Sequence, residues 1–124
     1  MTTPVDGGLK ITWKWGTSRG SLQKEDPMAT FVVLASFTDQ GIRNVKETIK
    51  RAEAFKDLAK KSGVTVKDMY WTLGRHDVVA ICEAADDESS TALMLSVSSR
   101  GYVRSETLRA FSFDEMKNVI GKMV

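Results

Sequence analysis

The chain has 124 residues, of which 42% are hydrophobic and 27% are charged. That composition is typical of a globular protein large enough to bury one core. Its 18 basic and 16 acidic residues leave a net charge of +2, too small a surplus to indicate nucleic-acid binding. One cysteine excludes an intrachain disulfide, and no apolar run is long enough to span a membrane. We therefore expect a cytoplasmic protein that binds neither nucleic acid nor membrane.

Residues 1–27 differ in character from the rest, being rich in Gly, Ser, Thr and Lys. Apolar and polar residues alternate from Leu9 to Trp15, which predicts a short strand, and residues 16–21 (GTSRGS) are typical of a flexible linker. We expect this segment to be an N-terminal extension, outside a functional domain at residues 28–124. The alternative is a docking peptide led by Trp13 and Trp15, because aromatic anchors are common in binding hot spots.

The domain begins with a strand at residues 30–37 (TFVVLASF), which is apolar on both alternating sets and is therefore predicted to be buried on both faces. Thr38 or Asp39 can cap the helix that follows, and Gly63 can take the left-handed position that closes it. Apolar residues recur at helical spacing between these limits. They are Ile42, Val45, Ile49, Ala52, Phe55 and Ala59.

Two further strands are expected at residues 64–73 and 76–84, joined by a two-residue type II′ turn at Gly74 and Arg75. The first is polar enough to be an edge strand, whereas the second is apolar on both sides at its centre (VVAIC). Asp86 or Asp87 can cap a second helix, which Gly101 ends. A mixed polar strand at residues 102–111 is predicted to be the other edge.

Ser112 and Glu115 have the spacing of a capping box, and apolar residues follow at i, i+3, i+4 and i+7 from Met116. This pattern predicts a short closing helix. The whole order is strand-helix-strand-strand-helix-strand and then helix, which is an α+β, ferredoxin-like arrangement with an extra C-terminal helix. In that topology the first and third strands are central, and these are the two strands that are apolar on both faces.

The helices of such a fold cover one face of the sheet and leave the other bare. If the turn has two residues, one face carries Met69, Trp71, Leu73, His76, Val78, Ala80 and Cys82. The opposite face carries Tyr70, Val79 and Ile81. Either set would form a large apolar patch in water, which monomers avoid, so we expect a homodimer of the dimeric α/β-barrel type. A monomer whose closing helix covers the bare face is the alternative.

Three stretches resemble the GYD domain family: MATFVVLASFTDQGIRNVKETIKRAEAFK, GVTVKDMYWTLGRHDVVAICEA and VRSETLRAFSFDEM. The resemblance covers nearly all of residues 28–124 and none of residues 1–27. The family's Gly-x-Tyr-Asp pattern reads Gly74-Arg75-His76-Asp77 here, so histidine stands in place of the tyrosine. Members are generally described as small bacterial and archaeal proteins of unknown function. The resemblance therefore implies a fold and not a reaction.

His76 is the only histidine and a weak catalytic candidate, because a histidine beside a carboxylate such as Asp77 can act as a general base or a ligand. Neighbouring strand residues point to opposite faces, however, so a turn or surface role is the alternative. His76 can also serve as a single axial haem ligand. One histidine and one cysteine are too few for an all-protein zinc site in a monomer, and we expect no metal.

Besides His76, six residues are candidates for ligand binding, namely Tyr70, Trp71, Gly74, Asp77, Arg104 and Arg109. The arginines can hold a carboxylate or phosphate, or can protect an edge strand by charge. The aromatic residues can line a cavity or pack in the core. Cys82 is expected to behave as a small buried hydrophobe rather than as a reactive thiol.

No motif in the chain identifies a reaction or a cofactor. The leading hypothesis is a homodimeric domain that binds a small molecule or a protein partner. One alternative is a small enzyme that uses the dimer cavity, with cofactor-free or haem-dependent oxygenase-like activity, by fold analogy alone. The other is a structural or interaction module with residues 1–27 as its docking arm.

Overall fold

The computed structural model describes residues 5–6, 9–10, 12–15, 22–25 and 28–124. Residues 29–110 form one unit, called the α+β unit below, while the described residues up to Met28 and residues 111–124 fall in a second unit. The α+β unit contains, in chain order, β5 (Ala29–Phe37), α1 (Asp39–Arg43), the 3-10 turn η1 (Val45–Glu47), α2 (Thr48–Lys61), β6 (Val64–Trp71), β7 (Val78–Ala84), α3 (Asp87–Ser98) and β8 (Val103–Ala110).

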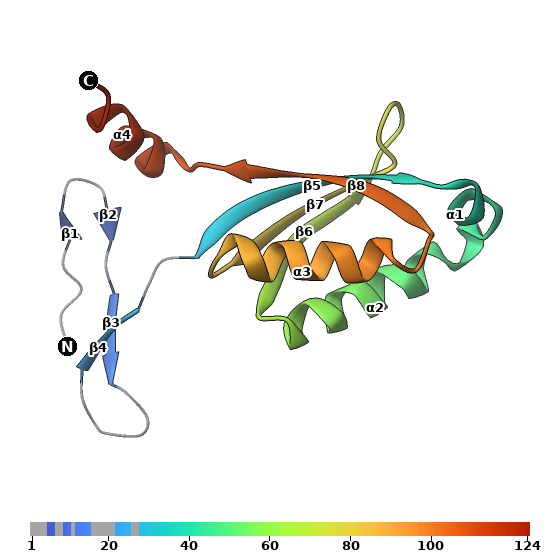
Figure 1. Ribbon diagram of the computed structural model, residues 1–124, viewed down its shortest axis with the longest axis horizontal. Coiled ribbons are helices and arrows are strands. Elements are labelled where there is room, and N and C mark those ends of the chain that lie inside the picture. Colours follow the sequence, from blue (N-terminus) through green and yellow to red (C-terminus); the bar gives the residue numbers. More distant parts are fainter. Residues whose placement is uncertain (1–4, 7–8, 11, 16–21, 26–27) are drawn as a thin grey trace. The chain divides into compact units, whose positions relative to one another are not determined.

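The four strands of the α+β unit make one antiparallel sheet in the order β6-β7-β5-β8 (Figure 1). β5 pairs with β7 from Ala29↔Ala84 to Ala35↔Val78, and its other edge pairs with β8. The two strands predicted to be central, because they are apolar on both sides, are therefore central. The predicted α+β class and ferredoxin-like arrangement are confirmed, and β6 and β8 are the edges as expected.

Helices α2 and α3 lie together on one face of this sheet and cover the core (Figure 1). Side chains alternate between the two faces of a strand, so every second residue is buried under the helices along β7 and in the middle of β5. The buried strand residues are Phe31, Val33, Ala35, Val78, Ala80, Cys82 and Ala84. The helices contribute Phe55, Ala59, Leu93 and Met94 to the same core.

The first helical region differs from the single helix that its periodicity predicts, because it breaks at Asn44. The Asn44 backbone has φ −109° and ψ 28°, and its side-chain Nδ2 donates to the Gln40 carbonyl at 2.8 Å. Gly41 in α1 sits so close to the Tyr102 carbonyl oxygen that a Cβ would lie 2.0 Å from it. Docking at Tyr102 thus sets the position of α1, while α2 packs separately on the sheet.

The break leaves part of the predicted apolar stripe outside the core. Ala52, Phe55 and Ala59 are buried as expected. Ile42, Val45 and Ile49 instead remain 54%, 36% and 56% exposed. We call these three residues the exposed ridge.

The connection between β6 and β7 is longer than the predicted two-residue turn, since residues 72–77 all lie outside the strands. The pairing Trp71↔Val78 is nevertheless the register that a turn centred on Gly74 and Arg75 produces, and the predicted faces of both strands follow from it. Gly74 has φ +111°, a conformation that L side chains rarely adopt. Thr72 ties the base of the loop, donating its N–H to the Asp77 carbonyl at 2.8 Å and its hydroxyl to the His76 carbonyl at 2.6 Å.

Two helix caps in the α+β unit match the sequence prediction. The Thr38 hydroxyl accepts from the Gly41 N–H at 3.0 Å at the start of α1. The Asp86 carboxylate accepts from the Ser89 N–H at 2.7 Å at the start of α3, and this backbone hydrogen bond lowers the pKa of Asp86. Gly63 and Gly101, which follow α2 and α3, have φ values of +77° and +87°. These are the left-handed positions expected where helices close.

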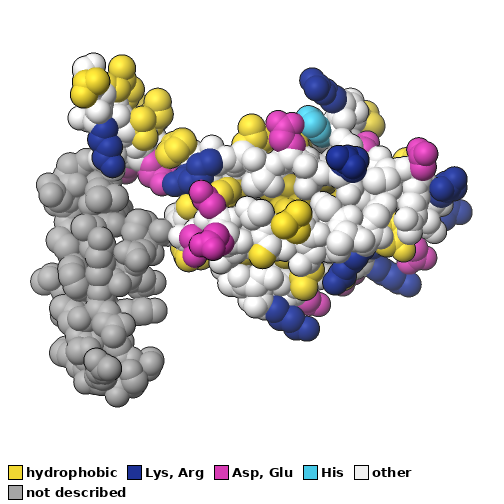
Figure 2. Space-filling view, in the orientation of Figure 1, with side chains coloured by type: hydrophobic (Ala, Val, Ile, Leu, Met, Phe, Trp, Pro, Cys, Tyr) yellow, Lys and Arg dark blue, Asp and Glu magenta, His cyan; other side chains and the backbone are white. Residues whose placement is uncertain are grey.

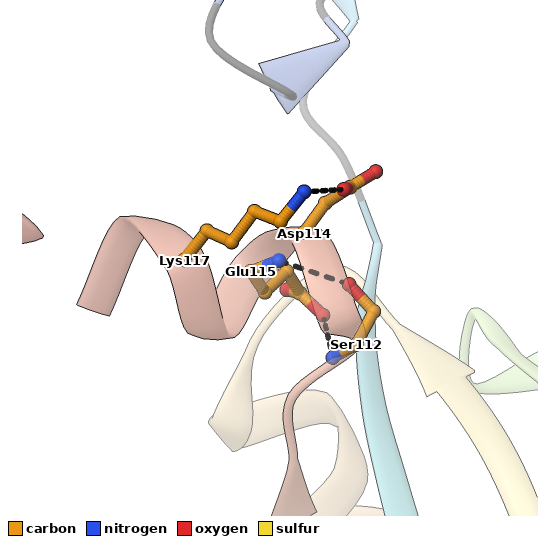
Figure 3. A network of polar contacts seen from close by, with 4 residues as sticks. All are labelled: Ser112, Asp114, Glu115 and Lys117. Carbon is orange, nitrogen blue, oxygen red and sulfur yellow. Dashed lines mark hydrogen bonds and ion pairs between the residues drawn. The ribbon is translucent and has the colours of Figure 1, made fainter. Parts of the chain in front are cut away.

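The second unit contains the predicted closing helix, α4 (Phe113–Gly121), and its capping box (Figure 3). The Ser112 hydroxyl accepts from the Glu115 N–H at 3.1 Å, and the Glu115 carboxylate accepts from the Ser112 N–H at 2.9 Å. Lys117 Nζ lies 3.9 Å from the Asp114 carboxylate on the same helix. A helix long and apolar enough to cross a membrane does not occur in the part of the chain that the structure describes.

The described N-terminal residues form two short antiparallel pairs. β1 (Val5–Asp6) pairs with β2 (Leu9–Lys10), and β3 (Thr12–Trp15) pairs with β4 (Leu22–Glu25). The single strand predicted between Leu9 and Trp15 corresponds to two strands, β2 and β3, which belong to different two-stranded sheets. The linker predicted at residues 16–21 lies outside the described residues, and the separate role of residues 1–27 stays a prediction.

Candidate functional site

Asp77 fastens the beginning of β7 to the end of β5. Its N–H donates to the Ala35 carbonyl at 2.8 Å, and its carboxylate accepts from the Phe37 N–H at 2.8 Å. The carboxylate therefore continues the hydrogen bonding beyond the last paired residues of the two strands. This contact gives the aspartate of the Gly-x-Tyr-Asp pattern a structural role.

His76 lies at the surface beside this contact, where it is the cyan side chain of Figure 2. The residue is half-buried, and its Nδ1 is buried without a hydrogen-bond partner. The Asp77 carboxylate bonds to the Phe37 backbone, and no hydrogen bond joins it to His76 among the described contacts. The catalytic role of His76 stays a prediction.

The predicted ligand-binding residues lie in several places rather than in one site. Tyr70 and Arg104 share the sheet face away from the helices but lie on opposite edge strands. Gly74 and His76 lie in the loop after β6, whereas Trp71 lies on the helix-covered face. Arg109 lies on the helix-covered face as well, with its guanidinium carbon 5.8 Å from the centroid of the Phe31 ring.

Arg109 also makes polar contacts with the backbone beside it. Its Nη1 donates to the Ala110 carbonyl and lies 3.5 Å from the Thr30 carbonyl oxygen. Arg109 and Ala110 pair with Phe31 and Thr30 near the start of β5. This is the opposite end of the sheet from the pair Trp71↔Val78. The structure therefore does not bring Arg109 together with the other candidates.

The sheet face away from the helices has an apolar centre, which we call the open-face patch. It consists of Val32, Leu34, Tyr70, Val79, Ile81 and Leu108, which neighbour one another across four paired strands. Tyr70 and Leu108 are 58% and 41% exposed. Around the patch lie Asp68, Glu83, Arg104 and Glu106. An apolar centre with a charged rim of both signs is the usual anatomy of a protein–protein interface.

A pocket of about 180 Å³ lies between α2, α3 and the covered face of the sheet, and we call it the helix–sheet pocket. It occupies the end of the sheet where β5 and β6 finish and β7 and β8 begin. Most of its lining is apolar and includes Val33, Phe55, Ala80 and Met94. Trp71 is the one predicted ligand-binding residue in this lining, and its Nε1 donates to the Thr48 hydroxyl at 3.0 Å.

Arg51 of α2 lines the same pocket and was not a candidate on sequence grounds. Its guanidinium carbon lies 4.5 Å from the centroid of the Tyr102 ring, within the range of a cation–π interaction. Its Nη2 is buried and has no hydrogen-bond partner. A signal for it exists in the sequence, since Arg51 precedes the core residue Phe55 by four positions and so shares its helix face.

Cys82 packs in the core, as the sequence predicts. It is 2% exposed, and its strand neighbours are Phe31 of β5 and Val66 of β6. Burial raises the pKa of its thiol from 9.0 to about 11, so the reactive thiolate is suppressed at neutral pH. In the described ranges, no three His, Cys, Asp or Glu side chains are grouped so that they could hold a metal ion.

Comparison with known proteins identifies the family of this chain. The family model described as the GYD domain matches residues 31–120, well over half of the sequence. The chain belongs to the GYD domain family. In this GYD domain, the aspartate of the Gly-x-Tyr-Asp pattern binds backbone and the position of the tyrosine holds His76.

A curated relative of this GYD domain is a protein from Thermus thermophilus named glutamine synthetase and cystathionine beta-lyase binding protein. The two are 38% identical over 84 residues, which span 67% of this chain and 88% of the relative. Among solved structures, the C-terminal domain of the MgtC protein from Mycobacterium tuberculosis matches with a TM-score of 0.49 and 13% identity. That match covers 71% of this chain and 93% of the MgtC domain.

Proposed function

We propose that this GYD domain acts by binding a partner protein, and that the partner is a glutamine synthetase or a cystathionine beta-lyase. The observation that carries the proposal is the 38% identity to a relative whose name states that it binds these two enzymes. The alignment extends over 88% of that relative, so the match involves nearly the whole binding protein rather than a fragment. Two exposed apolar surfaces on the α+β unit give the proposal a physical basis.

The first surface, the open-face patch, is proposed to pair with the same patch of a second copy. Its half-buried centre at Val32, Leu34, Val79 and Ile81 is an apolar surface of the kind that monomers seldom leave exposed. Its rim carries both Arg104 and Glu106, so an isologous two-fold contact can place opposite charges across the interface. Sheet-against-sheet pairing would give the dimeric α/β barrel expected from the sequence.

The second surface, the exposed ridge, is proposed to receive the partner enzyme. Ile42, Val45 and Ile49 belong to α1, η1 and α2, and the open-face patch is made of strand residues alone. Charged neighbours such as Arg43, Lys46 and Lys50 can supply a polar rim around them. Three exposed apolar side chains so close together in the sequence offer a partner protein apolar area to cover.

Binding to purified enzyme tests the function directly. The full-length chain should bind the glutamine synthetase or the cystathionine beta-lyase of its own organism with a Kd of about 10 μM or lower in calorimetry. Ile49→Lys should weaken binding at least about tenfold, because it places a charge in the middle of the apolar contact. The matched control is Leu95→Lys, a similar change at a 66% exposed leucine of α3, which should bind as the natural chain does.

Two results would count against this function. Absence of binding to both enzymes at about 100 μM would overturn the choice of partner. If Ile49→Lys and Leu95→Lys lose the same amount of affinity for the enzyme, the choice of partner stands but the exposed ridge is not the docking surface. Light scattering on both variants shows whether either change acts through the oligomeric state instead.

A further inference from the structure

The helix–sheet pocket has one polar end and one apolar end. Thr48, Arg51 and Trp71 lie at the polar end, where α2 begins and β6 finishes. The remaining lining is largely aliphatic or aromatic, with Val33, Ala80 and Met94 buried beneath the helices. A ligand that matches these walls must therefore have a compact apolar body and a single polar group.

The guanidinium of Arg51 defines the charge of that polar group. Arginine remains protonated in proteins, and a buried N–H donor without a partner is costly to the folded state. Stacking on Tyr102 positions the guanidinium plane but leaves the Nη2 donors unused. A carboxylate is the group whose two oxygens best fit the guanidinium fork.

The other charges around the pocket favour an anion as well. The described lining includes Arg100, which is exposed, and contains no aspartate or glutamate. An entering carboxylate would therefore meet two cations and no like charge. Because Arg100 is exposed, Arg51 supplies the one buried guanidinium nitrogen of the described lining, and a single fork suits a monoanionic carboxylate better than a dianionic phosphate.

The volume limits the size of the apolar body. An apolar cavity of about 150 Å³ can hold a benzene molecule. The helix–sheet pocket, at about 180 Å³, is slightly larger. It accommodates one ring or one branched chain with a carboxylate.

We propose that the helix–sheet pocket is a binding site for a small apolar monocarboxylate, an aromatic or branched aliphatic acid, whose carboxylate pairs with Arg51. The apolar body would rest against Val33, Ala80 and Met94. The site lies under the helices, whereas the surfaces proposed for pairing and for the partner enzyme are the open sheet face and the exposed ridge. The proposal of a carboxylate site can therefore succeed or fail independently of the proposed function.

Sodium benzoate is the probe, titrated into the full-length protein and followed by nuclear magnetic resonance. Saturable shifts of the Val33 and Met94 methyl signals are expected below about 10 mM. Benzyl alcohol has the same ring and no charge, and it should bind at least about tenfold more weakly because it cannot pair with the guanidinium.

Arg51→Met removes the guanidinium while retaining an apolar stem, so it should reduce benzoate affinity at least about tenfold and leave benzyl alcohol unchanged. Arg104→Met on the open face is the matched control and should bind benzoate as the natural chain does. If Arg51→Met does not fold, Arg51→Lys serves instead, since it keeps the charge, loses the fork and should bind benzoate with reduced affinity. Absence of saturable shifts, equal affinity for the two probes, or undiminished benzoate binding in the Arg51 variant would each overturn the proposal.

Discussion

Cys82 shows how the surroundings of a residue decide its chemistry. The thiol lies between the two neighbouring strands under the helices, and desolvation there disfavours the charged thiolate. Its pKa consequently rises from 9.0 to about 11. The folded protein holds the thiol proton more tightly than the unfolded chain does. The resulting stabilisation is complete below pH 9.0 and is lost as the pH rises towards about 11.

We therefore predict that alkaline pH destabilises the protein partly through Cys82. Between about pH 8 and about pH 10.5, the natural chain should lose about 1–2 kcal/mol more unfolding free energy than Cys82→Ala. Urea unfolding of both proteins at the two pH values measures the difference. Because lysines and tyrosines titrate in both proteins, only the difference between them reports the thiol. Identical losses would show that Cys82 ionises with the same pKa in the folded and unfolded states.

At the scale of elements, the joint between β5 and β7 depends on a side chain rather than on the strands alone. Beyond Ala35↔Val78 the ladder ends, and the Asp77 carboxylate takes over as acceptor for the Phe37 N–H. Asp77→Ala should cost about 1–3 kcal/mol of unfolding free energy, because a partly buried donor then loses its partner. Urea unfolding measures this cost, and hydrogen exchange of the Phe37 amide should become faster.

Asp77→Asn is the matched control, since its side-chain oxygen can still accept from the Phe37 N–H. We expect Asp77→Asn to retain more than half of the unfolding free energy that Asp77→Ala loses. If Asp77→Ala and Asp77→Asn both unfold at the same urea concentration as the natural chain, the hydrogen bond does not stabilise this joint.

The strand order could be predicted from the sequence because burial on both faces leaves a local mark. The runs TFVVLASF and VVAIC are apolar at consecutive positions, which only central strands require. The caps at Thr38, Asp86 and Ser112 could be predicted for a similar reason, since each side chain accepts from an N–H only three residues later in the chain.

The break at Asn44 and the role of Arg51 could not be predicted in the same way, because both depend on Tyr102. Ile42, Val45 and Ile49 satisfy helical spacing, yet Gly41 docks against the Tyr102 carbonyl from far along the chain. Arg51 shares a helix face with Phe55, but arginine is usually exposed, and nothing local indicates that its guanidinium lies over the Tyr102 ring. The sequence therefore predicted the scaffold better than the candidate site.

At the scale of the whole α+β unit, the two faces of the sheet have different roles. Helices α2 and α3 cover one face and enclose the core and the helix–sheet pocket, while the open-face patch has no helix of this unit upon it (Figure 1). If a second copy covers the patch, the protein should have twice its 13.7 kDa chain mass at micromolar concentration. Val79 lies near the middle of that interface, since it pairs with Leu34 of β5 and Tyr70 of β6.

Val79→Lys should therefore shift the protein to the monomer mass in light scattering, with the dimer Kd raised at least about a hundredfold. Pairing would bury the new ammonium group without a counter-charge, whereas in the monomer the long side chain can extend to water from a half-buried position. Circular dichroism should consequently show a folded domain. Leu95→Lys adds the same charge on the outer side of α3 and should leave the dimer intact. A natural chain that is monomeric at micromolar concentration would contradict the pairing itself. A Val79→Lys variant that remains as dimeric as Leu95→Lys would instead move the interface away from the open face.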